Sequence, residues 1–126
     1  MKKIILILVC FSTLSFMGCD DSCVCQSGPH FGELTIKLTI NDENPEVWVT
    51  VFRDKIEQKD TLFHESTSSN RIYYELEAGR YYSATVTYQK GVRQITAVDG
   101  KRMEVMSDDC GCDYAEDINL NLKLLK

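Results

Sequence analysis

Four cysteines in two closely spaced pairs are the residues of this chain whose types and spacing could do chemistry. The pairs are Cys23-Val24-Cys25 and Cys110-Gly111-Cys112. Four thiolates could hold a zinc ion, a cuprous ion or an iron–sulfur cluster, whereas four oxidised cysteines would form two disulfides. Structural zinc sites usually place two residues between paired cysteines, and here each pair has one. The spacing therefore favours disulfides, with metal binding or redox chemistry as the alternative.

The connectivity of these cysteines follows from ring size. Two disulfides among four cysteines allow three connectivities. A bond within either pair would close a very small, strained ring, so we expect each bridge to join the N-terminal pair to the later pair. The first such bridge closes a loop of nearly the whole domain and by chain entropy contributes about 4 to 5 kcal/mol, and the second adds much less.

Other catalytic chemistry has few candidates in this sequence. The chain holds two histidines, His30 and His64, and neither belongs to an HExxH pattern. We find no Gly-x-Ser-x-Gly nucleophile motif and no phosphate-binding glycine loop. The acidic residues around the second cysteine pair lack the alternating spacing of a calcium loop. We therefore predict a protein that is not an enzyme and has no catalytic residues, cofactor or dedicated metal site.

Four aromatic residues form a candidate binding surface. Trp48, Phe52, Tyr73 and Tyr81 alternate with the apolar positions of their segments, so they fall on the faces opposite the main core. Exposed rings suit a sugar or a protein partner, because they offer a large contact area with a polar handle. Glycan or small-ligand binding through these rings is one hypothesis. The alternative is that a second layer of the fold covers them.

Strands must position all of these residues, since apolar and polar residues alternate along most of the chain. The expected strands are 34–40, 46–53, 61–65, 71–77, 82–88, 92–98, 101–106 and 118–124. Residues 46–53 should form a central strand covered on both faces, and 61–65 an edge strand. Asp99-Gly100 should form the tight turn of a hairpin. The pattern predicts an all-β, antiparallel two-sheet sandwich of seven or eight strands.

A short motif narrows the expected fold. The run Leu76-Glu77-Ala78-Gly79-Arg80-Tyr81 resembles the Leu-x-Pro-Gly-x-Tyr signature of transthyretin-like and carboxypeptidase-regulatory-like sandwiches, with Ala78 in place of proline. The resemblance implies a transthyretin-like or immunoglobulin-like fold. It also implies a corner tyrosine, Tyr81 or Tyr82, whose hydroxyl bonds back to the backbone. It carries over no active-site residues.

The prealbumin-like resemblance extends further along the chain. With Tyr88-Gln89-Lys90-Gly91 and Ala97-Val98-Asp99-Gly100, the chain is similar to small Bacteroidota lipoproteins of the prealbumin-like type, over about its last 95 residues. The domain then spans residues 31–126.

The N-terminal segment resembles a bacterial lipoprotein signal peptide. Lys2 and Lys3 precede a short apolar run, and Gly18 directly precedes Cys19. The run is shorter than the roughly 20 apolar residues that cross a bilayer. The resemblance implies that residues 1–18 are removed, that Cys19 carries lipid, and that residues 19–30 form a short tether.

The same resemblance suggests a location in a Gram-negative cell envelope. The residues before Gly18 are bulkier than usual, as in Bacteroidota lipoproteins, which favours the outer membrane. Asp20 and Asp21 fit either inner-membrane retention or surface export, so the side of the membrane stays open.

Charge limits the class of partner. Loss of Lys2 and Lys3 with the signal leaves 12 Lys and Arg against 19 Asp and Glu, a formal charge of −7. This balance argues against nucleic acid. We expect a non-catalytic, lipid-anchored interaction or accessory module with an envelope protein as partner. Glycan binding and cysteine-based metal or redox chemistry are the alternatives.

Overall fold

The computed structural model describes residues 23–125, which fold into strands joined by short turns. One 3-10 turn, η1 (Ile56–Gln58), interrupts them. The strands are β1 (Phe31–Lys37), β2 (Val47–Arg53), β3 (Asp60–Thr67), β4 (Arg71–Glu77), β5 (Arg80–Lys90), β6 (Arg93–Met103), β7 (Val105–Ser107), β8 (Asp113–Ala115) and β9 (Ile118–Asn121). The described chain is thus all-β, as the alternation predicted.

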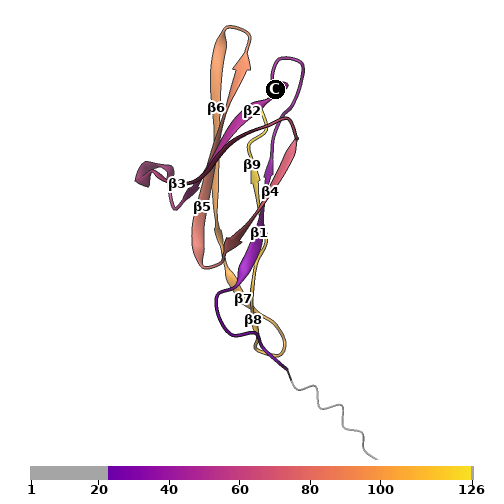
Figure 1. Ribbon diagram of the computed structural model, residues 1–126, viewed down its shortest axis with the longest axis vertical. Helices are drawn as coiled ribbons and strands as arrows, with labels where there is room; N and C mark the ends of the chain where they lie inside the picture. Colours follow the sequence, from indigo (N-terminus) through magenta and orange to yellow (C-terminus); the bar gives the residue numbers. More distant parts are fainter. Residues whose placement is uncertain (1–22, 126) are drawn as a thin grey trace, which may run out of the picture.

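Two sheets pack face to face, and a small ribbon extends from one end of them (Figure 1). One sheet has the order β4-β1-β9 and the other β3-β2-β5-β6, so the sandwich itself contains seven strands. The ribbon pairs β7 with β8. Neighbouring strands are antiparallel except β1 and β9, which run parallel. The predicted two-sheet sandwich is confirmed, with one parallel ladder and two additional short strands.

The core lies between the sheets, and all of its residues except Met103 belong to the alternating apolar faces of the predicted strands. It consists of Leu34, Ile36, Leu38, Val47, Val49, Val51, Leu76, Tyr82, Ala84, Val86, Tyr88, Met103, Ile118, Leu120 and Leu122, each at most 7% exposed. Full burial of one such large apolar side chain contributes about 1.5 to 3 kcal/mol. This layer of side chains holds the two sheets together.

The prediction for residues 46–53 is right about position and wrong about covering. The strand β2 is central, because it pairs with β3 on one side and β5 on the other. Its second face is open, and Trp48 on that face is 57% exposed. The described residues form two layers, so nothing packs outside the β3-β2-β5-β6 sheet over Trp48.

The predicted hairpin at Asp99-Gly100 is wrong. Strand β6 continues through both residues, and Gly100 pairs with Ser83 in β5. The chain reverses at Gly91, between the predicted strands 82–88 and 92–98, and φ there is +62°. Gly100 serves close packing, since a Cβ there would lie 2.8 Å from Cε1 and Cζ of Tyr81. Gly100 is therefore required for packing against Tyr81 on the neighbouring strand. Local turn preferences do not include such a contact between strands.

The β4–β5 corner carries the motif singled out in the sequence. Gly79 has φ of +86°, and its N–H donates to the carbonyl oxygen of Met103 over 2.6 Å. The hydroxyl of Tyr82 donates to the carbonyl oxygen of Glu77. Of the two candidate corner tyrosines, Tyr82 is the one that makes this bond. Tyr81 points to the opposite face of the sheet, over Gly100.

Candidate functional site

Two disulfides join the N-terminal cysteine pair to the later pair. Cys23 bonds Cys110 with Cα atoms 5.7 Å apart, and Cys25 bonds Cys112 with Cα atoms 5.1 Å apart. Each bridge spans 87 residues of sequence. The expected connectivity between the pairs is confirmed. We call these two bridges the disulfide clamp.

The loop between β7 and β8 presents the second pair, and Asp108 organises it. The Oδ1 atom of Asp108 accepts hydrogen bonds of 2.9 Å from the backbone N–H groups of Cys110 and Cys112. The N–H of Asp108 donates to the carbonyl oxygen of Cys112 over 2.9 Å, and Gly111 adopts φ of +75°. From the sequence alone, Asp108 is only one of the acidic residues around the second cysteine pair. Its place two residues before Cys110 was the available signal, because aspartate often bonds a backbone N–H two residues on.

The clamp lies at one end of the long axis. In Figure 1 the β7–β8 ribbon forms this end, and the start of the described chain lies against it. Cys19 and the segment 1–18 lie outside the described residues, as do residues 20–22. Within residues 23–125, the structure has no helix long and apolar enough to cross a membrane.

The four cysteines are oxidised, and this state determines whether the disulfide clamp could bind a metal ion. A disulfide sulfur is not a thiolate, and metal ligation requires the thiolate. Across residues 23–125, no group of three or more His, Cys, Asp or Glu side chains is placed to hold a metal ion. The metal or redox alternative would therefore first require reduction of both bridges.

The four candidate aromatic residues do not form one platform. Trp48, Phe52 and Tyr81 lie on the outer face of the β3-β2-β5-β6 sheet, since the residues beside them in sequence face the core. Tyr73 lies on the outer face of the other sheet and is 56% exposed. The two faces look away from each other, so a ligand on Trp48 would not contact Tyr73.

Trp48 is held by His64 and Thr50, which the sequence did not place in the candidate binding surface. Its indole stacks on the imidazole of His64, with ring centroids 4.9 Å apart and planes at 20°. The Nδ1 atom of His64 lies 2.8 Å from the hydroxyl oxygen of Thr50, within hydrogen-bonding distance. His64 and Thr50 are direct partners across β2 and β3. These contacts fix the orientation of an exposed ring, which favours binding because less freedom is lost.

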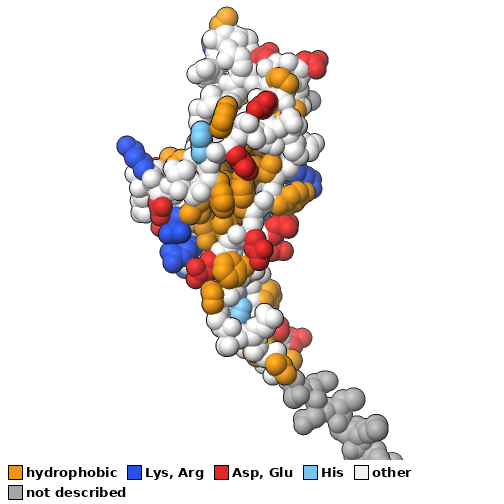
Figure 2. All heavy atoms as spheres, in the orientation of Figure 1, with side chains coloured by type: hydrophobic (Ala, Val, Ile, Leu, Met, Phe, Trp, Pro, Cys, Tyr) orange, Lys and Arg blue, Asp and Glu red, His pale blue; other side chains and the backbone are white. Residues whose placement is uncertain are grey.

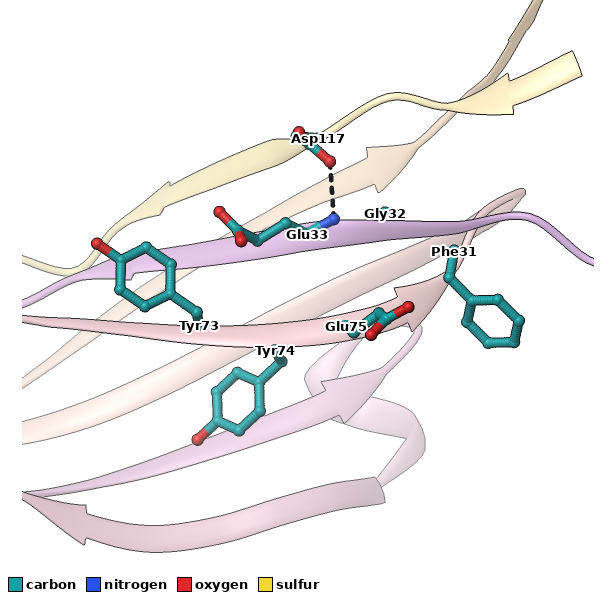
Figure 3. A pocket seen from close by; sticks show the side chains of 7 residues that line it. All are labelled: Phe31, Gly32, Glu33, Tyr73, Tyr74, Glu75 and Asp117. Atoms are coloured by element: carbon teal, nitrogen blue, oxygen red, sulfur yellow. Dashed lines mark hydrogen bonds between the residues drawn. The ribbon is translucent and has the colours of Figure 1, made fainter.

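A hollow of about 410 Å³ opens on the outer face of the β4-β1-β9 sheet (Figure 3). Glu33 and Glu75 face each other across β1 and β4, and the N–H of Glu33 donates to Asp117 over 2.8 Å. Tyr73 and Tyr74 point to opposite sides of β4 in this view. These three carboxylates make the hollow acidic.

Apolar side chains gather on the side of the sandwich where β3 and β4 come together (Figure 2). Phe63 of β3 stacks on Tyr74 of β4, with ring centroids 4.5 Å apart. The hydroxyl of Tyr74 also donates to the carboxylate of Glu65. Burial is the larger cause and this bond to Glu65 the next, and together they raise the pKa of Tyr74 well above its usual range. These contacts join the two sheets along the side of the core where β3 and β4 lie.

Comparisons with protein-family models, curated proteins and solved structures find no match to this chain.

Proposed function

We propose that this protein is a non-catalytic lipoprotein of the cell envelope, anchored through Cys19, whose sandwich domain serves as an interaction module. The observation that carries the proposal is the disulfide clamp, which fastens Cys23 and Cys25 to the β7–β8 loop directly after the candidate lipid site. A tether that is bridged twice at its start would hold the domain close to its anchor.

The short tether sets the orientation of the domain. Cys23 lies four positions after Cys19 in the sequence, which gives a reach of at most about 14 Å at 3.3 to 3.6 Å per residue. The β7–β8 end then lies next to the membrane surface, and the long axis points away from it. Both outer sheet faces and the β5–β6 hairpin are left accessible to a partner. A bacterial outer membrane is the location we favour.

An interaction role fits the side chains better than catalysis. The exposed faces offer stacked aromatic residues, hydroxyls and carboxylates, and the histidine on them, His64, is engaged with Trp48 and Thr50. A protein partner in the envelope is the first candidate. Binding of a glycan is the second, and the exposed, preoriented indole of Trp48 is the observation that favours it.

Lipidation can be tested by metabolic labelling of the full chain. Cells expressing it are fed an alkyne-tagged palmitate, and the label on the purified protein is read after coupling to a dye. We expect strong labelling that Cys19→Ser abolishes. Cys10→Ser is the matched control, because Cys10 lies inside the proposed signal segment, and it should keep the label. Labelling that survives Cys19→Ser, or no labelling at all, would overturn the anchor.

A further inference from the structure

Outward residues of the β3-β2-β5-β6 sheet form two neighbouring rows of uncharged side chains. One row is His64, Thr50, Thr85 and Val98, which are successive partners across β3, β2, β5 and β6. The next row contains the pair Ser66 and Trp48 and the pair Thr87 and Thr96. We call these two rows the Trp48 face.

The absence of Lys, Arg, Asp and Glu from the Trp48 face is unusual for this chain. Charged residues make up 26% of the sequence. The outer face of the other sheet shows the contrast, with Glu33 opposite Glu75 and Lys37 opposite Arg71. A face without Lys, Arg, Asp or Glu cannot form a salt bridge with a charged ligand. Its partner should therefore be uncharged where it touches these rows.

Hydroxyls and one large ring dominate the Trp48 face. Trp48 and Val98 are 57% and 56% exposed, and threonines of β5 lie between their strands. The hydroxyl oxygens of Thr87 and Thr96 lie 3.2 Å apart. Such hydroxyls can each donate and accept a hydrogen bond. Each row crosses four strands from β3 to β6, and three strand spacings of about 4.8 Å give it a length of about 14 Å. This length exceeds that of a single sugar ring.

We propose that the Trp48 face binds an uncharged glycan chain laid across the strands, with one sugar ring on the indole of Trp48. The apolar C–H face of that ring would pack on the indole, and its hydroxyls would exchange hydrogen bonds with Thr85, Thr87 and Thr96. His64 and Thr50 are positioning residues, because they hold the indole in place. The proposal rests on the interaction role above and takes its second candidate, a glycan, as the ligand of the Trp48 face.

The chemistry of the face favours a glycan over a protein. The fully buried centre of a protein interface is more apolar than its rim. Here Trp48 and Val98 are separated by threonines, and a protein that displaced water from them would have to supply hydrogen-bond partners for their hydroxyls. A glycan has a hydroxyl on nearly every carbon and remains hydrated at its edges, so the same threonines keep their hydrogen bonds.

The location of the face fits an anchored binder. The pair Thr87 and Thr96 lies near the β5–β6 hairpin, at the end of the sandwich away from the disulfide clamp (Figure 1). With the clamp held at the membrane, Trp48 would face the space beyond the lipid headgroups. A long polysaccharide could reach it there without crossing the bilayer.

The single tryptophan of the chain makes a direct test possible. Trp48 is the sole tryptophan, so the intrinsic fluorescence of the full chain in detergent reports this face. We would titrate four neutral polysaccharides separately: dextran, mannan, xylan and a soluble β-glucan. We expect at least one to shift the emission and to reduce acrylamide quenching at least twofold. Polygalacturonate, an acidic polymer, should change neither.

Variants locate the site in a gel assay that needs no tryptophan. Retardation of the protein in a native gel containing the active polysaccharide should fall at least tenfold in Trp48→Ala. Tyr73→Ala is the matched control, since Tyr73 is equally exposed on the opposite sheet, and it should stay within twofold of wild type. His64→Ala should weaken binding less than Trp48→Ala, because it loosens the indole without removing it.

Several results would overturn the glycan proposal. These are no response to any of the four polymers, equal binding of polygalacturonate, or retardation that persists in Trp48→Ala. Shielding of Trp48 that needs no glycan and rises with protein concentration would identify a second copy as the occupant instead. None of these results bears on palmitate labelling at Cys19, so failure of the ligand and failure of the anchor remain distinguishable.

Discussion

The hydroxyl of Tyr82 donates a hydrogen bond of 2.5 Å to the carbonyl oxygen of Glu77, across the turn that takes the chain from one sheet of the sandwich to the other. Glu77 ends β4 and Arg80 begins β5, so two residues make the crossing. The ring of Tyr82 is buried in the core while its hydroxyl reaches the backbone of the preceding strand. One side chain thus fixes the angle at which the second sheet starts.

Removal of this hydroxyl should destabilise the fold. Tyr82→Phe keeps the ring but removes the part-buried hydrogen bond to the carbonyl of Glu77, and the loss of such a bond costs about 1 kcal/mol. Urea unfolding followed by circular dichroism would measure the loss. Tyr81→Phe is the matched control, because its hydroxyl lies on the outer face, and a change within about 0.5 kcal/mol is expected. Equal losses in the two variants would contradict the corner role.

Gly100 and Tyr81 should show strong energetic coupling. A Cβ at Gly100 would overlap the phenol ring of Tyr81, so Gly100→Ala should cost about 1 to 3 kcal/mol through overpacking. In a Tyr81→Ala background the ring is gone, and the same substitution should be nearly neutral. A double-mutant cycle from urea unfolding measures the difference. Additive effects would place the strain elsewhere in β6.

The sequence predicted the features of the fold that depend on local alternation. Core positions such as Val49 and Val86 follow from period two, and the Ala78-Gly79 turn follows from its motif. Asp99 shows where this reasoning ends. Its carboxylate accepts N–H groups of Gly100 and Asn121, each over 2.8 Å, and so bridges β6 to β9. The bond to Asn121 joins residues distant in sequence. The Asp99-Gly100 dipeptide considered alone therefore predicts a turn.

The candidate site was predictable to a smaller extent for the same reason. Cysteine spacing indicated the connectivity of the disulfides, because ring size is a local quantity. The aromatic residues were found by alternation, but their division between two sheets depends on strand order. Trp48 and Tyr73 have the same local pattern and nearly the same exposure, yet they occupy opposite outer faces. The uncharged rows around Trp48 appear only once the register of β2, β3, β5 and β6 is known.

Tyr88 should make stability fall at alkaline pH. Its ring is fully buried, and its hydroxyl donates to the carbonyl oxygen of Leu122 over 2.7 Å and accepts the N–H of Thr39 over 2.9 Å. Burial raises the pKa of Tyr88, and the bonds from Thr39 oppose this in part. The folded state therefore keeps the proton longer than the unfolded chain. Its contribution is complete below the ordinary tyrosine pKa of about 10 and is lost as pH rises above that value.

Urea unfolding at a series of pH values from neutral to alkaline would measure this dependence. Tyr88→Phe should be less stable than wild type at neutral pH by about 1 to 3 kcal/mol, since Leu122 and Thr39 lose their partner. Its stability should then decline less steeply above pH about 10, because one raised tyrosine is absent. Burial raises the pKa of Tyr82 too, so part of the decline should remain. An unchanged slope in Tyr88→Phe would contradict the assignment.

The two bridges of the disulfide clamp should stabilise the domain non-additively. Both close loops of the same length, so either one alone supplies most of the restriction on the unfolded chain. Replacing Cys25 and Cys112 together by alanine should cost about 2 kcal/mol, the closure entropy of the small ring that the second bridge completes. Replacing all four cysteines should cost about 6 kcal/mol or more, which exceeds the sum of the two single-bridge losses.

Urea unfolding of variants that lack the Cys25–Cys112 bridge, the Cys23–Cys110 bridge or both measures this relation. Asp108→Ala gives an independent check on the loop. Because Asp108 orders the N–H groups of Cys110 and Cys112, its loss should slow oxidative refolding while leaving both bridges formed at the end.

The intact native protein should weigh less than its reduced form by four hydrogen atoms and resist alkylation of these cysteines. Alkylated thiols, with an excess mass that is lost on denaturation, would instead indicate a bound metal. The clamp would then be a thiolate site, and the bound metal would fix the tether in place of the two disulfides.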